Sequence, residues 1–308
     1  MNRGNNWKEL IEHTKTCVDQ SLKSASEVVF GASPEILRDA VNYSLFAPGK
    51  RLRPLLVCFT AQACGATIEA ALPAAIAVEM VHTYSLIHDD LPAMDNDDLR
   101  RGLPTCHVKY GEAAAILAGD ALLTAAFEWL SHCYPPRLAA VNVLLLSRGA
   151  GASGMVGGQM LDLIAEGRYE NYPRPGSVAE LELIHRLKTG ALFSVCCQMG
   201  LEVAKEFAQP VPPAKYDDLV KNFSQSFGLA FQIADDLLDV EAHVDVVGKK
   251  TGKDADRGKL TFPTVLGIDA SRERAYTLYQ QSLELINQMG VGSQPLAALV
   301  RMIMERDR

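Results

Sequence analysis

The sequence predicts an all-α fold in which helices form a bundle around a central cavity. Long stretches rich in Ala and Leu occupy most of the 308 residues, and the alternation of apolar and polar residues typical of strands is nearly absent. Short turn signals divide these stretches. We therefore expect helices over residues 6–29, 54–64, 70–91, 111–132, 178–204 and 213–240.

Each expected helix is bounded by residues that begin or end helices. Pro54 opens the helix over 54–64, because proline is favoured in a first turn, and Gly65 follows its last residue. The remaining boundaries lie at Ala47-Pro48-Gly49, Tyr134-Pro135-Pro136, 171–176 and 210–213. These segments are turns rather than linkers, so we expect a single helical domain over residues 1–308.

The composition argues against several classes of protein. A net charge of -7 and a pI near 5.5 argue against binding to nucleic acid. The seven cysteines are odd in number and contain no CxxC pair, so neither a disulfide framework nor a zinc site is expected, and the natural compartment is a reducing cytoplasm. The N-terminus lacks the apolar core of a signal peptide, and Pro73 and Glu79 interrupt the most apolar run, so we expect neither export nor stable membrane insertion.

Two clusters of aspartates lie far apart in the sequence, each at the end of an apolar, helix-like run. Closely packed carboxylates repel one another unless they are protonated or bridged by a cation. Mg2+ prefers oxygen ligands and commonly joins one or two carboxylates to substrate phosphates. Basic residues follow both clusters, so the sequence predicts a site for magnesium and a diphosphate. The clusters consist of Asp89, Asp90 and Asp95, and of Asp235, Asp236 and Asp239.

The spacing within each cluster predicts how its carboxylates lie. Asp235 and Asp239 are four residues apart and share one helix face. Asp90 and Asp95 are five apart and would diverge on a regular helix, but Pro92 should interrupt the helix and let Asp95 turn back.

Several further motifs occur in a fixed order along nearly the whole chain, and together they resemble the motifs of a known family. The chain resembles the trans-prenyltransferases (polyprenyl synthases) that build short isoprenoid diphosphates, and most of all their bacterial farnesyl diphosphate synthase members. A DDxxD string alone would be weak evidence, whereas this many ordered blocks are specific. The blocks are Pro48–Pro54, His82–His88, Leu99–Gly102, Gly119–Leu122, Gly157–Gln159, Lys188–Gly190 and Phe231–Gln232.

The resemblance implies an isoprenoid synthase type of helical bundle and a head-to-tail condensation. Isopentenyl diphosphate would be joined to dimethylallyl and geranyl diphosphate to give farnesyl diphosphate, through ionisation of the allylic diphosphate and attack on the carbocation. Diphosphate leaves only when its charge is neutralised, which metal ions and fixed cations achieve without proton transfer. About three Mg2+ ions are implied, held by Asp89, Asp90, Asp95, Asp235 and Asp239.

The resemblance also assigns the basic and neutral polar residues. Lys50, Arg53, His82 and Arg101 would bind isopentenyl diphosphate, and Arg100, Lys188, Lys249 and Lys259 would bind the allylic diphosphate. Thr189 and Gln232 would lie near the developing carbocation, where they and Lys188 serve catalysis. An isolated basic pair is usually solvated surface. Arg100 and Arg101 follow the first acidic cluster, and Lys249 and Lys259 follow the second, which favours the functional interpretation.

The length of the product is a question of packing, because the growing chain must follow an apolar tunnel until a bulky side chain stops it. Tyr84, five residues before Asp89 and next to the small Ser85, is the predicted floor. Its alternative interpretation is an aromatic core residue. The resemblance further implies a homodimer.

Three alternatives compete with a farnesyl diphosphate synthase. A geranyl or geranylgeranyl diphosphate synthase differs only in product length. A class I terpene cyclase shares the acidic metal sites but binds a single diphosphate, so it does not need Lys50, Arg53 and Arg101. A noncatalytic synthase subunit would be expected to have lost one acidic cluster, and both are complete here.

Overall fold

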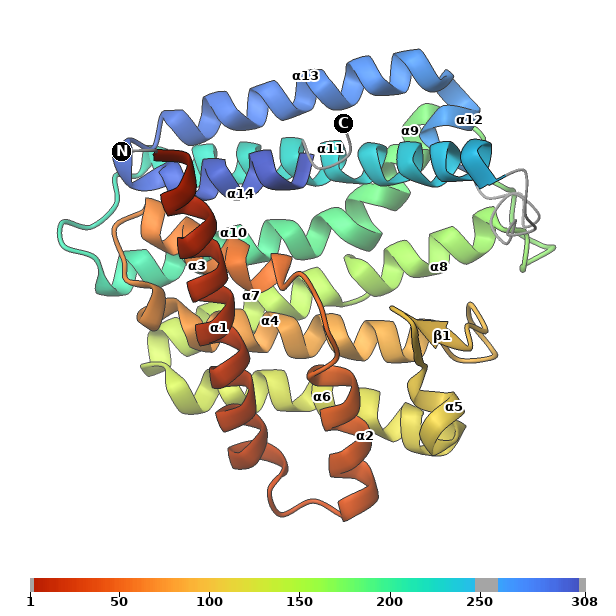
Figure 1. Ribbon diagram of the computed structural model, residues 1–308, viewed down its shortest axis with the longest axis horizontal. Helices are drawn as coiled ribbons and strands as arrows, with labels where there is room; N and C mark the ends of the chain where they lie inside the picture. The colour runs from red at the N-terminus through yellow and green to blue at the C-terminus, as the bar shows by residue number, and fades with distance from the viewer. Residues whose placement is uncertain (1–2, 247–259, 305–308) are drawn as a thin grey trace.

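The computed structural model describes residues 3–246 and 260–304 and confirms the all-α fold (Figure 1). The part of the chain that it describes contains a single two-stranded antiparallel hairpin besides the helices. Its elements are α1 (Arg3–Phe30), α2 (Glu35–Leu45), α3 (Leu52–Ala63), α4 (Ile68–Asp89), β1 (Leu99–Arg100), β2 (Leu103–Pro104), α5 (Cys106–Tyr110), α6 (Glu112–Cys133), α7 (Pro136–Ala150), α8 (Met155–Ala165), α9 (Val178–His185), the π-helical turn η1 (Arg186–Gly190), α10 (Ala191–Phe207), α11 (Lys215–Val246), α12 (Phe262–Leu266), α13 (Ile268–Asn287), the 3-10 turn η3 (Val291–Ser293) and α14 (Gln294–Met304).

The expected helices agree with the structure to different degrees. Those over 6–29, 54–64, 70–91 and 111–132 correspond to α1, α3, α4 and α6 within a few residues. The expected helix over 178–204 is wrong as a single regular element, because the π-helical turn η1 separates α9 from α10. Helices α2, α7, α8, α13 and α14 lie outside the expected ranges, and α11 extends beyond residue 240.

Helix α4 runs through the apolar core and sets the position of the site. Thr67 caps its first turn by accepting a hydrogen bond from the Ala70 N–H over 3.2 Å. Most of its side chains are buried, as expected for a helix that is apolar on all sides and packs against α3, α6 and α10. Pro73 lies inside the helix near its start and does not break it, in agreement with the helix expected over 70–91.

Three helical segments are long and apolar enough to cross a membrane, by length and composition alone: Ile68–Asp89, Glu112–Cys133 and Pro136–Ala165. The first has 67% of its apolar window buried inside the bundle, and the other two have 39% each. The apolar character of α4 therefore fits its place in the core.

The carboxyl ends of α4, α8 and α11 lie at the same end of the molecule (Figure 1). The β1–β2 hairpin follows α4 at this end, and α1 crosses the front of the bundle. Since the two acidic clusters occupy the carboxyl-terminal parts of α4 and α11, the fold brings segments far apart in the sequence to one end of the bundle.

Candidate active site

The first acidic cluster lies where α4 ends. The helix stops at Asp89, and the chain turns back so that the Asp95 N–H donates to the Asp89 carbonyl over 2.8 Å. Asp95 turns back as predicted, but the helix already ends at Asp89, before it reaches Pro92. Arg168, beyond the end of α8, donates to the Met94 carbonyl over 2.6 Å and lies 3.9 Å from the Asp95 carboxylate, which ties down the turn.

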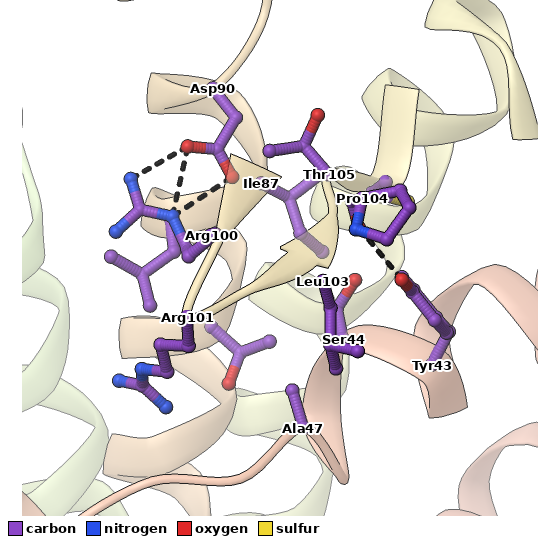
Figure 2. Close-up of a pocket in the computed structure, with 13 residues that line it drawn as sticks. Tyr43, Ser44, Ala47, Ile87, Asp90, Arg100, Arg101, Leu103, Pro104 and Thr105 are labelled. Carbon is purple, nitrogen blue, oxygen red and sulfur yellow. Dashed lines mark hydrogen bonds and ion pairs between the residues drawn. The ribbon is translucent and has the colours of Figure 1, made fainter. Parts of the chain in front are cut away.

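Asp90 is buried and pairs with Arg100 of β1 (Figure 2). Arg100 Nη2 lies 2.6 Å from Asp90 Oδ1, and Arg100 Nε lies 2.9 Å from both carboxylate oxygens. Burial raises the pKa of Asp90, and the Arg100 guanidinium opposes that rise. Arg101 points away from this pair, and its Nη1 donates to the Pro48 carbonyl over 2.6 Å. The Asp90 carboxylate thus already has a cationic partner, and its part in metal binding stays a prediction.

Asp89 lines a cavity of about 580 Å3 at the end of α4. Lys188 and Thr189 line the same cavity, and much of the remaining wall is apolar. Burial raises the pKa of Asp89 to about 6, with Lys188 opposing the rise and Asp95 adding to it. A carboxylate whose charge is disfavoured by burial is a good partner for a bound cation, which would restore its ionised form.

Tyr84 and Ser85 line this cavity too. Tyr84 is buried, and its ring lies edge-on to His88 with the ring centroids 5.8 Å apart. The Ser85 hydroxyl donates to the His82 carbonyl over 2.8 Å, so it does not extend into the apolar space as a free donor. The placement fits the predicted role of Tyr84 in chain length, which stays a prediction.

The π-helical turn η1 presents Lys188 and Thr189 to the cavity. Lys188 Nζ donates to Asp162 of α8 over 2.5 Å. Helix α8 can approach this closely only because residue 158 is Gly: a Cβ there would lie 2.1 Å from the Lys188 backbone nitrogen. π-helical turns inside α-helices often mark functional sites. Here the turn directs two predicted catalytic residues toward Asp89.

A second cavity, of about 680 Å3, is lined by Lys50, Arg53, His82, Arg101 and Asp235 among others. Arg53 Nη1 donates to His82 Nε2 over 3.1 Å. Because arginine only donates, His82 Nε2 accepts and the ring is neutral. Burial, followed by the charges of Arg53 and Arg101, lowers the pKa of His82 well below its usual value, which agrees with this protonation state.

Arg53 is a buried cation of this cavity whose hydrogen-bonding groups are not all satisfied by the described residues. Its guanidinium carbon lies 5.0 Å from the centroid of the Phe193 ring, and its Nε has no hydrogen-bond partner in the described part of the chain. Burial lowers the pKa of Arg53, with Asp235 and Glu79 among the groups that oppose it. A buried donor without a partner is costly unless a ligand supplies an acceptor, so this position suits an anion.

Arg53 and His82 line both cavities, so the two adjoin at this pair. An anion held by Lys50, Arg53 and Arg101 would lie next to a ligand held at Asp89 and Lys188. The structure thus places Lys50, Arg53, His82 and Arg101 next to the space lined by Asp89 and Lys188. Arg100, predicted for the allylic diphosphate, lines neither of these two cavities.

The second acidic cluster lies on α11. Asp235 and Asp239 are exposed and one turn apart, as their spacing predicts, whereas Asp236 is buried. Asp236 accepts the Phe262 N–H over 3.0 Å and lies 3.3 Å from His185 Nε2. Asp236 therefore joins α11 to the start of α12 and the end of α9.

Gln232, predicted to lie near the carbocation, donates from Nε2 to the Asp236 carboxylate over 3.3 Å. It is not among the described residues that line the two cavities. Its catalytic role stays a prediction.

The carboxylates fit magnesium by the chemistry of their donors, which are all oxygens. Among the described residues, no three His, Cys, Asp or Glu side chains form a group that could hold a metal ion by themselves. Mg2+ is usually bound by one or two carboxylates together with substrate phosphates and water. The site therefore suits an ion that arrives with a diphosphate.

Two predicted residues, Lys249 and Lys259, lie outside the described residues. Sequence reasoning missed two residues of the site: Asp162, which contacts Lys188, and Arg168, which contacts the turn that carries Asp95. Asp162 could have been found, because it lies three residues after Gln159, the last residue of the Gly157–Gln159 block. Gln159 also lines the cavity, and its Nε2 lacks a partner in the part of the chain that the structure describes.

An all-helical bundle with two acidic clusters beside fixed cations has the features of a protein that binds magnesium and diphosphates. The model of the polyprenyl synthetase family matches residues 34–289, so the chain belongs to this family. The family expected from the ordered motifs is thereby confirmed.

Known relatives extend the similarity to almost the full length. The chain is 40% identical over 308 residues to the farnesyl diphosphate synthase of Escherichia coli, covering 96% of this chain and 99% of the relative. It is also 40% identical over 305 residues to a geranylgeranyl diphosphate synthase of Cyanophora paradoxa, covering 97% and 94%. The crystal structure of an apo FPP/GFPP synthase from Zymomonas mobilis superposes with a TM-score of 0.83 at 35% identity, covering 98% of this chain and 99% of that one.

Proposed function

We propose that this protein is a short-chain prenyl diphosphate synthase that makes farnesyl diphosphate. It would condense isopentenyl diphosphate first with dimethylallyl and then with geranyl diphosphate. One observation supports the proposal most directly. The cavity lined by cations and the cavity lined by Asp89 and Lys188 adjoin each other, and the Arg53–His82 pair lines both. The similarity to named farnesyl diphosphate synthases supports the same activity.

The allylic substrate would occupy the cavity beside Asp89, with its apolar tail directed toward Tyr84. Lys188 and Arg100 would contact its diphosphate, together with Lys249 and Lys259. Magnesium, when bound, supplies the positive charge that makes diphosphate a good leaving group. The residues that would hold about three such ions are Asp89, Asp90, Asp95, Asp235 and Asp239.

Isopentenyl diphosphate would bind Lys50, Arg53, His82 and Arg101 in the neighbouring cavity. The allylic C–O bond breaks, the double bond of isopentenyl diphosphate forms the new C–C bond, and the released pyrophosphate accepts the proton that is lost. The neutral dipoles of Thr189 and Gln232 would stabilise the cation without becoming alkylated. The protein's contribution is to hold the two substrates side by side and to exclude water.

We also propose a cytoplasmic homodimer that acts as one helical domain over residues 1–308. The homodimer rests on the resemblance to the family, because the exposed apolar side chains Ile116, Val156 and Met160 of α6 and α8 line the cavity beside Asp89. The net charge of -7 supports the absence of a nucleic-acid partner.

Release of pyrophosphate separates the proposal from a terpene cyclase, and a variant of the second acidic cluster separates it from a noncatalytic subunit. The purified protein with Mg2+ should release pyrophosphate only when geranyl and isopentenyl diphosphate are both present. A terpene cyclase would release it from the allylic diphosphate alone. Asp235→Ala should abolish nearly all turnover, and unchanged turnover of this variant in a reconstituted complex would favour a noncatalytic subunit.

A further inference from the structure

Arg51 lies in the loop that opens the cation-lined cavity, between Lys50 and Arg53, and the proposed reaction gives it no role. Its backbone has φ 49° and ψ 34°, a left-handed conformation that residues other than Gly rarely adopt. Its side chain is only 6% exposed. Such a conformation persists where the surroundings fix it, and it is found preferentially at functional sites.

The Arg51 guanidinium joins two helices. Its Nε lies 2.8 Å from Asp19 Oδ1 of α1, and its Nη1 lies 2.7 Å from Glu79 Oε1 of α4. Burial alone would lower the pKa of Arg51, but Glu79 and Asp19 raise it, so the group stays charged. On the other side of the loop, Arg101 donates to the Pro48 carbonyl over 2.6 Å. The loop is thus held from α1, α4 and the hairpin.

Glu79 is a carboxylate in an unexpected place. Its side chain is 6% exposed and lines the same cavity as the cations Lys50, Arg53 and Arg101. Left alone, a buried carboxylate there would attract these cations and compete with an anionic ligand. Burial lowers the pKa of both Arg53 and Arg101, and the charge of Glu79 opposes that lowering at both.

We infer that Arg51 is a positioning residue for isopentenyl diphosphate: it holds the Glu79 carboxylate, so that Arg53 and Arg101 stay available to the diphosphate, and it fixes the loop that carries Lys50. This inference rests on the proposed function, because it assigns the cation-lined cavity to that substrate. Arg51 itself is occupied by two carboxylates and does not contact the ligand.

Steady-state kinetics of three variants test the inference. Arg51→Met should raise the KM for isopentenyl diphosphate about tenfold, equivalent to about 1.4 kcal/mol, and change the KM for geranyl diphosphate less than about twofold. Arg51→Met/Glu79→Met removes the competing carboxylate and should recover most of that loss. Arg137→Met is the matched control, because it breaks the exposed Arg137–Glu206 pair away from the site and should change neither KM.

Other outcomes would overturn the positioning role. These are an equal rise in both KM values, a double variant as impaired as Arg51→Met, or a loss of thermal stability with unchanged KM values. If Arg51→Met does not fold, Glu79→Met takes its place and should leave the KM for isopentenyl diphosphate near or below that of the wild type; a tenfold rise would overturn the inference.

Calorimetric titration with isopentenyl diphosphate alone separates this inference from the proposed activity. If Arg51→Met binds isopentenyl diphosphate more weakly than the wild type, the positioning role is supported. If the wild type also performs no condensation, the proposed function is contradicted while the positioning role stands. Equal affinity of the wild type and the folded variant contradicts the positioning role, whatever the activity.

Discussion

Neighbouring aspartates of one motif have different environments. Asp89 faces the cavity, whereas Asp90 is buried against Arg100. In the second cluster, Asp235 is exposed and Asp236 bonds to the Phe262 N–H. The sequence indicates that these carboxylates lie together, but the partner of each depends on segments that approach only in the folded chain.

Asp90→Asn should destabilise the protein even without metal or substrate, because Arg100 loses its charged partner. Breaking a fully buried pair costs about 3–5 kcal/mol, and since Arg100 is partly exposed we expect about 1–3 kcal/mol. Urea unfolding in the presence of a chelator measures this. Asp269→Asn, at a fully exposed carboxylate, is the control and should be neutral. Identical unfolding midpoints for Asp90→Asn and wild type would contradict the structural role.

Tyr84→Ala should lengthen the main product beyond farnesyl diphosphate, because it removes a buried ring from the wall of the cavity beside Asp89. Mass analysis of the products measures the change. Tyr84→Phe keeps the ring and should keep the product. If Tyr84→Ala still stops at farnesyl diphosphate, the floor lies elsewhere.

His82 should make the folded protein less stable in mild acid. Its pKa is lowered on folding, so below about pH 6.5 the unfolded chain binds a proton that the folded chain does not. The free energy of unfolding then falls by up to about 1.4 kcal/mol per pH unit, and this loss disappears as the pH rises above 6.5. His82→Gln should therefore gain stability relative to wild type between pH 7.5 and 5 in urea unfolding. Parallel pH profiles would show that His82 titrates normally.

Apolar composition did not by itself decide which helices were predicted: the polar α1 was expected, whereas the apolar α7 and α8 were not. Residues 70–91 and 111–132 are apolar enough that α4 and α6 follow from composition, whereas α13 carries many charged residues and is fixed by packing against α11. No proline marks the turn η1 in the sequence, so the expected helix over 178–204 appeared continuous. Propensity does not specify such an irregularity, because packing between segments determines it.

The close contact of α8 with η1 gives a direct test of how this element positions Lys188. In Gly158→Ala, the new Cβ would lie 2.1 Å from the Lys188 backbone nitrogen, so η1 must shift. We expect a loss of about 1–3 kcal/mol in stability and a clear fall in kcat. Gly176→Ala adds a Cβ with no atom within 4 Å and should be harmless in both assays. Wild-type kcat in Gly158→Ala would contradict the need for close packing here.

The carboxyl end of α4, from the N-terminal half of the chain, lies at the same end of the bundle as those of α8 and α11, from the C-terminal half (Figure 1). The N-terminal half supplies Lys50, Arg53, His82 and Asp89, and the C-terminal half supplies Lys188 and Asp235. The motifs predicted which residues form the site, through the resemblance that orders them. They did not predict that the two cavities adjoin at Arg53 and His82, since that depends on the packing of α3 against α4.

The central claim is that the two adjoining cavities hold an allylic and a homoallylic diphosphate and stop elongation at fifteen carbons. Mass analysis of the products from purified protein, Mg2+, isopentenyl diphosphate and, separately, dimethylallyl, geranyl or farnesyl diphosphate tests it most directly. We predict farnesyl diphosphate from the first two and no extension of the third. Geranylgeranyl diphosphate as the main product would contradict the chain-length assignment, and the absence of any extended product would contradict the proposed reaction.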